Sequence, residues 1–156
     1  MRERRGHGRA RASLLRWTLA PTAAGLLLGV LWWLAAPGGI LHGDGSDLTS
    51  WDERDLVFAA LGAVAGGVTV TVLAAGRARS GLPDRGLAAL AGSVAGSALA
   101  AGMGLALGRI VGSRGADAAV PGSDFGLQAL SAAAVWPAVT ALGVLALTTL
   151  WWRDPK

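Results

Sequence analysis

The sequence has no cysteine, no tyrosine and no asparagine, and its only histidines are His7 and His42. Without cysteine the chain can form no disulfide, no thiolate nucleophile and no cysteine-ligated metal site. His42 lies near Asp44 and Asp47, but one histidine with scattered carboxylates on a glycine-rich stretch is typical of a solvated loop. We therefore expect no metal and no cofactor.

Charge is also absent from the interior of the apolar runs that dominate the sequence. No Asp, Glu, Lys, Arg or His lies deep in any of them. Ion-coupled transporters usually need an intramembrane charge, and intramembrane proteases need a catalytic or metal-binding set that these runs lack. The sequence therefore predicts a protein that is not an enzyme.

Four apolar runs are each long enough to cross a bilayer. They predict an all-α, polytopic membrane protein, a bundle of four transmembrane helices. The expected helices are residues 17–36, 55–75, 87–112 and 127–152, which together form one membrane domain over residues 17–152. A basic N-terminal tail, residues 1–16, is expected to be disordered, and residues 153–156 form a short C-terminal tail.

The distribution of charge predicts the orientation. The two tails and the middle loop contain 11 of the 14 Lys and Arg residues, and the other two loops contain seven of the ten acids. The positive-inside rule then places both termini in the cytoplasm, in a protein of the cell membrane. Trp32 and Trp33 fall near the outer edge, as in an interfacial aromatic belt. Topology thus explains the net charge of +4 without a nucleic-acid partner, although the basic tail could also bind anionic lipid or a polyanion.

Small residues recur at every fourth position of the third expected helix. These residues are Ala88, Gly92, Gly96, Ala100, Gly104 and Gly108, and Gly62 and Gly66 form a similar pair in the second helix. Such faces let helices approach closely in lipid. Each step of four residues advances about 40° beyond one turn. The third helix should therefore cross a partner steeply and right-handedly, or touch different neighbours at different depths. The stripe would pack helices within the chain or form an interface with a second copy or another membrane protein.

Two further features concern the helix ends and the fourth helix. Asp55 and Arg109 each lie at a helix end that suits their charge, and an antiparallel hairpin of the second and third helices would let them form an ion pair at the outer edge. Pro137 frees a helix carbonyl, so Trp136-Pro137 predicts a kink. The buried indole N–H of Trp136 would need an acceptor, either the freed carbonyl or a hydroxyl of Ser93, Ser97 or Thr140. This kink would be a fixed feature packed against the glycine face of the third helix, or else a gate or ligand pocket.

The chain resembles a family of small actinobacterial four-helix membrane proteins catalogued only as a domain of unknown function. The resemblance covers residues 26–152. It rests on Leu34–Pro37, on Asp55 followed by Phe58, on the glycine-rich helices and on Val135–Pro137. It implies an integral membrane protein with no assigned activity and no catalytic residues.

Two functional hypotheses remain open at this stage. The first is a non-enzymatic accessory or structural subunit that acts through helix–helix contacts, with the third helix as the contact surface. The alternative is a small transporter or channel whose polar path is lined by hydroxyls. The candidates for that path are Thr69, Thr71, Ser93, Ser97 and Thr140. The two hypotheses differ in whether these hydroxyls converge on a cavity or bond to backbone carbonyls.

Overall fold

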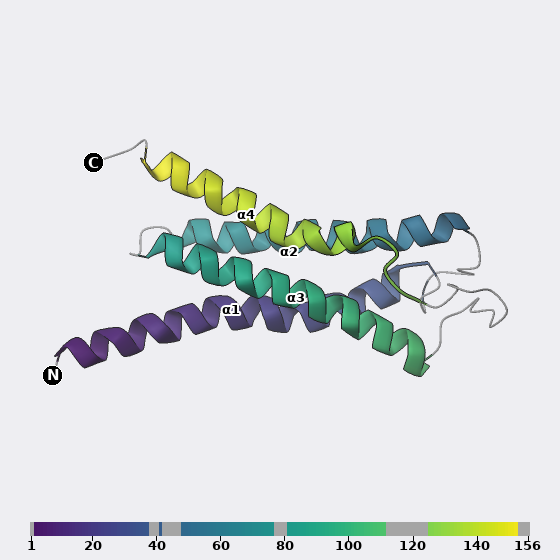
Figure 1. Ribbon diagram of the computed structural model, residues 1–156, viewed down its shortest axis with the longest axis horizontal. Coiled ribbons are helices and arrows are strands. Elements are labelled where there is room, and N and C mark those ends of the chain that lie inside the picture. The colour runs from purple at the N-terminus through teal and green to yellow at the C-terminus, as the bar shows by residue number, and fades with distance from the viewer. Residues whose placement is uncertain (1, 38–40, 42–47, 77–80, 112–124, 153–156) are drawn as a thin grey trace.

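The computed structural model describes residues 2–37, 41, 48–76, 81–111 and 125–152. These residues form four helices: α1 (Arg2–Ala35), α2 (Leu48–Ala75), α3 (Leu82–Val111) and α4 (Leu130–Trp152) (Figure 1). Each helix contains a stretch long and apolar enough to cross a membrane. The predicted class, an all-α multi-pass membrane protein, is confirmed.

Three of the helices extend further than the apolar runs. α1 begins at Arg2, so residues 2–16, which we expected to be disordered, continue the helix. Arginine and alanine are strong helix formers, and no proline precedes Pro21. Pro21 therefore lies well inside α1. α2 begins at Leu48, so Asp55 lies about two turns inside it.

The beginning of α3 depends on one glycine. Gly81 adopts a φ of +86°, which a residue with a Cβ rarely takes. Its carbonyl oxygen accepts a hydrogen bond of 3.1 Å from the Arg85 N–H. Pro83 and Asp84 follow in the first turn, where a missing N–H costs little and a carboxylate suits the helix dipole.

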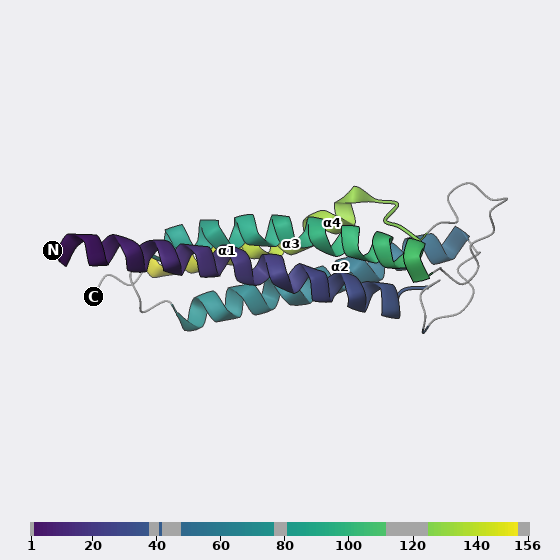
Figure 2. The ribbon, with the colours of Figure 1, turned by 90° about the horizontal axis from the view of Figure 1, so that it is seen from below.

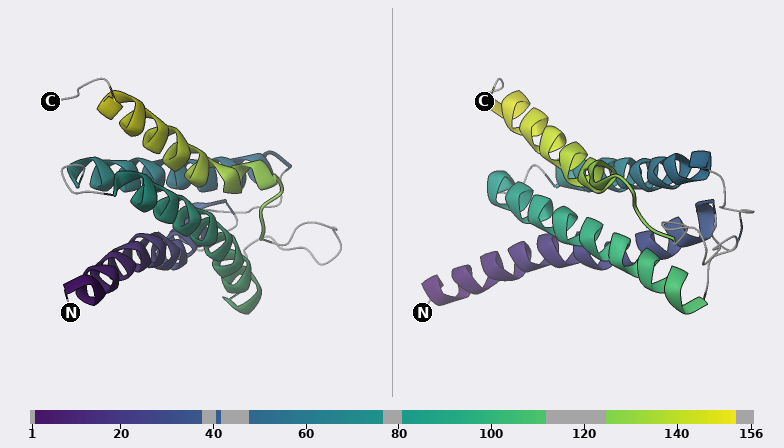
Figure 3. Two further views of the ribbon diagram at one scale, coloured as in Figure 1. Left: turned by 60° about the vertical axis from the view of Figure 1, so that its left-hand side comes forward. Right: turned by 45° about the vertical axis from the view of Figure 1, so that its right-hand side comes forward.

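The helices do not pack in their chain order. α1 packs mainly against α3, α2 packs mainly against α4, and α3 joins the two pairs by packing against α4. Consecutive helices, α1 with α2 and α2 with α3, make much smaller contacts. Figure 1 shows α3 crossing α1 obliquely, and Figure 2 shows the same two helices side by side from below. The two views of Figure 3 show how far the helices diverge toward their ends. The α1 start and the α4 end lie at the same end of the bundle (Figure 1).

The large buried side chains gather in the half of the bundle away from the α1 start. Trp32, Phe58, Phe125 and Trp136 belong to one core cluster. Trp32 is fully buried and Trp33 is 6% exposed, so neither forms the lipid-facing belt that their positions suggested. The reason is that α3 and α2 cover this end of α1 and turn a position at the membrane edge into core.

Candidate functional site

A buried arginine lies at the end of the bundle where α1 ends and α2 begins. Arg54 is 1% exposed. Its Nε–H donates a hydrogen bond of 2.7 Å to the carbonyl oxygen of Pro37, and its guanidinium carbon lies 5.4 Å from the centroid of the Phe125 ring. That distance suits a cation–π interaction. Arg54 therefore connects α2 to the segment after α1 and to the segment before α4.

Three aromatic rings pack together next to this arginine. Trp32 donates its indole N–H to the Arg54 carbonyl oxygen at 2.9 Å. Its ring lies 5.0 Å from Phe58, edge to face at 83°, and 4.7 Å from Phe125. We call these four residues, Trp32, Arg54, Phe58 and Phe125, the aromatic junction. It joins α1, α2 and the segment that leads into α4.

Asp55 caps the segment that leads into α4. The N–H groups of Gln128 and Ala129 donate to its two carboxylate oxygens, at 3.1 and 2.5 Å. Both residues directly precede Leu130, where α4 begins, so the carboxylate satisfies N–H groups at the entry to the helix. α2 thus fixes the point at which α4 begins.

This arrangement differs from the ion pair that we expected between Asp55 and Arg109. Among the described residues no ion pair joins the two side chains. Arg109 is exposed in the last turn of α3, and the α3 end diverges from the α2 start (Figures 1 and 3). The expectation assumed that α2 and α3 form a packed hairpin, whereas α3 packs against α1 and α4.

The small-residue stripe of α3 lies against α1. A Cβ placed on Gly96 would lie 2.5 Å from the carbonyl oxygen of Pro21, and one on Gly104 would lie 2.5 Å from Cζ3 of Trp32. A Cβ on Gly92 would collide with the Thr18 backbone. Ala100 is fully buried. From α1 the approach is equally close, because a Cβ on Gly25 would collide with Gly96.

The Gly108 end of the stripe meets another neighbour. A Cβ on Gly108 would lie 2.7 Å from the Cβ of Phe125, in the aromatic junction. The glycines of α2 face α4, since a Cβ on Gly62 would lie 3.3 Å from the backbone nitrogen of Trp136 and one on Gly66 would lie 2.7 Å from the Cβ of Val139. The drift of the stripe around α3 is therefore accommodated by an oblique crossing and by a change of neighbour.

Pro137 lies inside α4 and leaves the carbonyl of Ala133 without its helical N–H donor. Ser97 of α3 donates its hydroxyl to that oxygen at 2.6 Å. Trp136 is 2% exposed, and within the described structure its indole N–H has no hydrogen-bond partner. The freed carbonyl oxygen of Ala133 thus accepts its hydrogen bond from Ser97 and not from Trp136, and this bond joins α3 to α4.

The other hydroxyls proposed for a polar path also bond to backbone carbonyls. Thr69 donates to Ala65 at 2.8 Å and Thr71 to Gly67 at 2.8 Å. Ser93 donates to Leu90 at 2.8 Å, and Thr140 donates to Trp136 at 3.0 Å. Each of these four bonds lies within one helix. A shallow groove between α2 and α4 is lined by none of these hydroxyls.

The chemistry available at these positions is that of packing and hydrogen bonding. In the described part of the chain, no three His, Cys, Asp or Glu side chains come together as metal ligands, and His7 and His42 lie outside the described side chains. Sequence reasoning missed Arg54, which we counted as a loop charge. Its one signal was an arginine among three carboxylates, at positions 52, 53 and 55, directly before an apolar run.

No protein-family model matches the chain, and no curated protein or solved structure matches it. The resemblance to the actinobacterial four-helix family therefore stays a prediction.

Proposed function

We propose that this chain is a non-enzymatic accessory or structural subunit of the cell membrane that acts through helix–helix contacts. The observation that carries the proposal is the use made of the membrane-embedded hydroxyls. All five candidates for a polar path donate to backbone carbonyls, and Ser97 uses its bond to join two helices. Hydroxyls that donate to backbone carbonyls support a packing role. They give no support to the alternative of a transporter or channel, which would need them to line a polar path.

The surface available to a partner is the outward side of α3. The glycines that face α1 are already covered within the chain. On the opposite side of the same helix Ala91, Ala98 and Gly102 are exposed, and a Cβ on Gly102 would meet nothing within 4 Å. Small residues on a lipid-exposed face permit close approach by another helix. A second copy of the chain or another membrane protein would contact α3 there.

The orientation proposed for this subunit follows from charge. The α1 start and the α4 end lie together at one end of the bundle (Figure 1), and the tails and the middle loop hold most of the Lys and Arg. We infer that this end faces the cytoplasm.

The experiment compares Gly102→Leu with Gly67→Leu, because a Cβ at either glycine would enter open space. Gly102 lies on α3 and Gly67 on α2. Association of the full chain is measured in native lipid nanodiscs by crosslinking and by co-purification from its host membrane. We expect Gly102→Leu to reduce the associated fraction while Gly67→Leu leaves it unchanged. A wild-type chain that is monomeric and free of partners, or equal association in all three proteins, would refute the proposal.

A further inference from the structure

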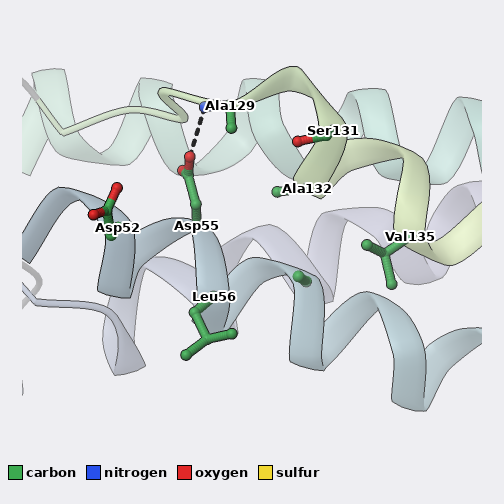
Figure 4. A pocket seen from close by; sticks show the side chains of 8 residues that line it. Asp52, Asp55, Leu56, Ala129, Ser131, Ala132 and Val135 are labelled. Carbon is green, nitrogen blue, oxygen red and sulfur yellow. Dashed lines mark hydrogen bonds between the residues drawn. The ribbon is translucent and has the colours of Figure 1, made fainter.

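A shallow groove runs between α2 and α4 next to the point where Asp55 caps α4. Its volume is about 330 Å³. It is lined by Asp52, Asp55, Leu56, Ala59, Ala129, Ser131, Ala132 and Val135 (Figure 4). The lining is mostly alanine and branched aliphatic, and the polar groups gather at one end. We propose that this groove binds a bilayer lipid whose headgroup carries a primary ammonium group, an inference that goes beyond the proposed function.

The position of the groove selects a lipid as its occupant. The charged residues at the start of α2 end at Asp55, where its apolar run follows, and the apolar helix α4 begins at Leu130, so the polar end of the groove lies where both helices would enter the hydrocarbon region. Below that level the lining becomes apolar through Ala59 and Val135. A lipid matches this arrangement, with its headgroup at the polar end of the groove and an acyl chain along the apolar end.

The charge at the mouth selects an ammonium group. Asp52 is exposed, and its carboxylate forms no hydrogen bond or ion pair with the part of the chain that the structure describes. Asp55 accepts one N–H on each oxygen, which leaves each oxygen with a second lone pair. Asp52 and Asp55 are the two charged residues of the groove lining, and no Lys or Arg of the lining offsets them. An anionic headgroup would be repelled here, whereas an ammonium group can donate hydrogen bonds to Asp52 and Asp55.

Ser131 supplies the remaining polar contact. Its side chain is exposed at the groove and lies on the first turn of α4, close to Ala129 (Figure 4). The hydroxyl can donate to a phosphate oxygen of a zwitterionic headgroup while the ammonium group reaches Asp52. The chemistry thus fits phosphatidylethanolamine better than phosphatidylglycerol, which lacks the cation, or phosphatidylcholine, whose quaternary ammonium has no N–H to donate.

The test measures lipid retention by the full chain. The protein is released from nanodiscs that hold equal amounts of phosphatidylethanolamine, phosphatidylglycerol and phosphatidylcholine with identical acyl chains, and the bound lipid is counted by native mass spectrometry. We expect phosphatidylethanolamine to be retained about twofold to fivefold more than either competitor, the range for one exposed ion pair. Asp52→Asn should remove the preference, and Asp52→Lys should turn it toward phosphatidylglycerol.

Glu53→Gln is the matched control, because Glu53 is exposed, adjacent and outside the groove lining. It removes one carboxylate from the same helical turn and should leave the preference unchanged. Helical circular dichroism checks that each variant is folded. Equal retention of the three lipids by the wild-type chain, a wild-type preference for phosphatidylglycerol, or an equal loss in Glu53→Gln and Asp52→Asn would overturn the proposal.

Discussion

The hydrogen bond between Ser97 and Ala133 should be the most informative single interaction to remove. Pro137 lacks the N–H that would otherwise bond to the Ala133 oxygen, so the Ser97 hydroxyl, at 2.6 Å, takes its place. Ser97→Ala leaves that carbonyl without a donor between two apolar helices. No water reaches the hydrocarbon region to replace it.

The expected loss is about 1 kcal/mol of unfolding free energy. A buried acceptor left unsatisfied costs roughly 1–3 kcal/mol in soluble proteins. Interhelical side-chain bonds in membranes average about 0.6 kcal/mol and reach about 1.7. The two ranges overlap at about 1–1.7 kcal/mol, and Ser97, which is 3% exposed and forms a bond of 2.6 Å, belongs in that overlap.

A double-mutant cycle isolates this bond from the loss of the hydroxyl itself. Pro137→Ala restores an N–H to residue 137, which can then bond to the Ala133 oxygen. Ser97→Ala should therefore cost less in that background, with a coupling energy of about 0.5–1 kcal/mol, as for neighbours in one hydrogen-bond network. Unfolding is followed in mixed micelles by helical circular dichroism.

Ser93→Ala is the matched control. Ser93 is fully buried on the same helix, but its hydroxyl bonds to Leu90, a carbonyl of α3 itself. The Leu90 oxygen keeps its helical donor when the hydroxyl is removed, so this variant should cost less than Ser97→Ala. Equal costs for the two serines, or an equal cost of Ser97→Ala with and without Pro137, would refute the reasoning.

Three further predictions concern packing, capping and orientation. Gly96→Leu should unfold the chain or lower its stability by several kcal/mol, since even a Cβ there overlaps α1, whereas Gly67→Leu should be nearly neutral; thermal aggregation in detergent compares them. Asp55→Ala should cost about 0.5–2 kcal/mol in the same mixed-micelle assay, because two N–H groups before α4 lose their acceptor, and a neutral result would contradict the cap. In this cysteine-free chain, Ser46→Cys should react with a membrane-impermeant maleimide added outside cells and Ser80→Cys should not; the reverse pattern would invert the proposed orientation.

The fold class could be predicted from sequence because insertion into a bilayer depends mainly on the length and composition of each run. The packing order could not. Apolar helices present similar surfaces all around, so nothing in the four runs says that α1 pairs with α3 and α2 with α4. The assumed hairpin of α2 and α3 followed from their short connection alone, and the expected pair of Asp55 and Arg109 depended on that assumption.

The glycines were informative about contact and uninformative about the partner. Gly92, Gly96 and Gly104 lie at close helix approaches, as the spacing indicates, but Gly102 on the same helix lies in open space. The sequence distinguishes them only through their position around the helix. The role of Arg54 could not be predicted for a different reason. It depends on Pro37 and Phe125, which lie far apart in the sequence and come together only in the fold.

The docking of α4 follows from backbone groups that α4 cannot satisfy by itself. The two residues before its start bond to α2 through their N–H groups, and its interior contains a proline, so two N–H groups and one carbonyl have partners on other helices. Asp55 of α2 supplies the acceptor and Ser97 of α3 supplies the donor. A shift of α4 by one turn would break all three bonds, and the Ala133 carbonyl, which lies between helices, would then cost about 1–3 kcal/mol, whereas the exposed N–H groups of Gln128 and Ala129 could bond to water. An apolar surface tolerates such a shift, because one alanine or leucine replaces another. The register of α4 in the bundle is therefore specified by backbone groups that have no local hydrogen-bond partner, and by the side chains of Asp55 and Ser97 that bond to them.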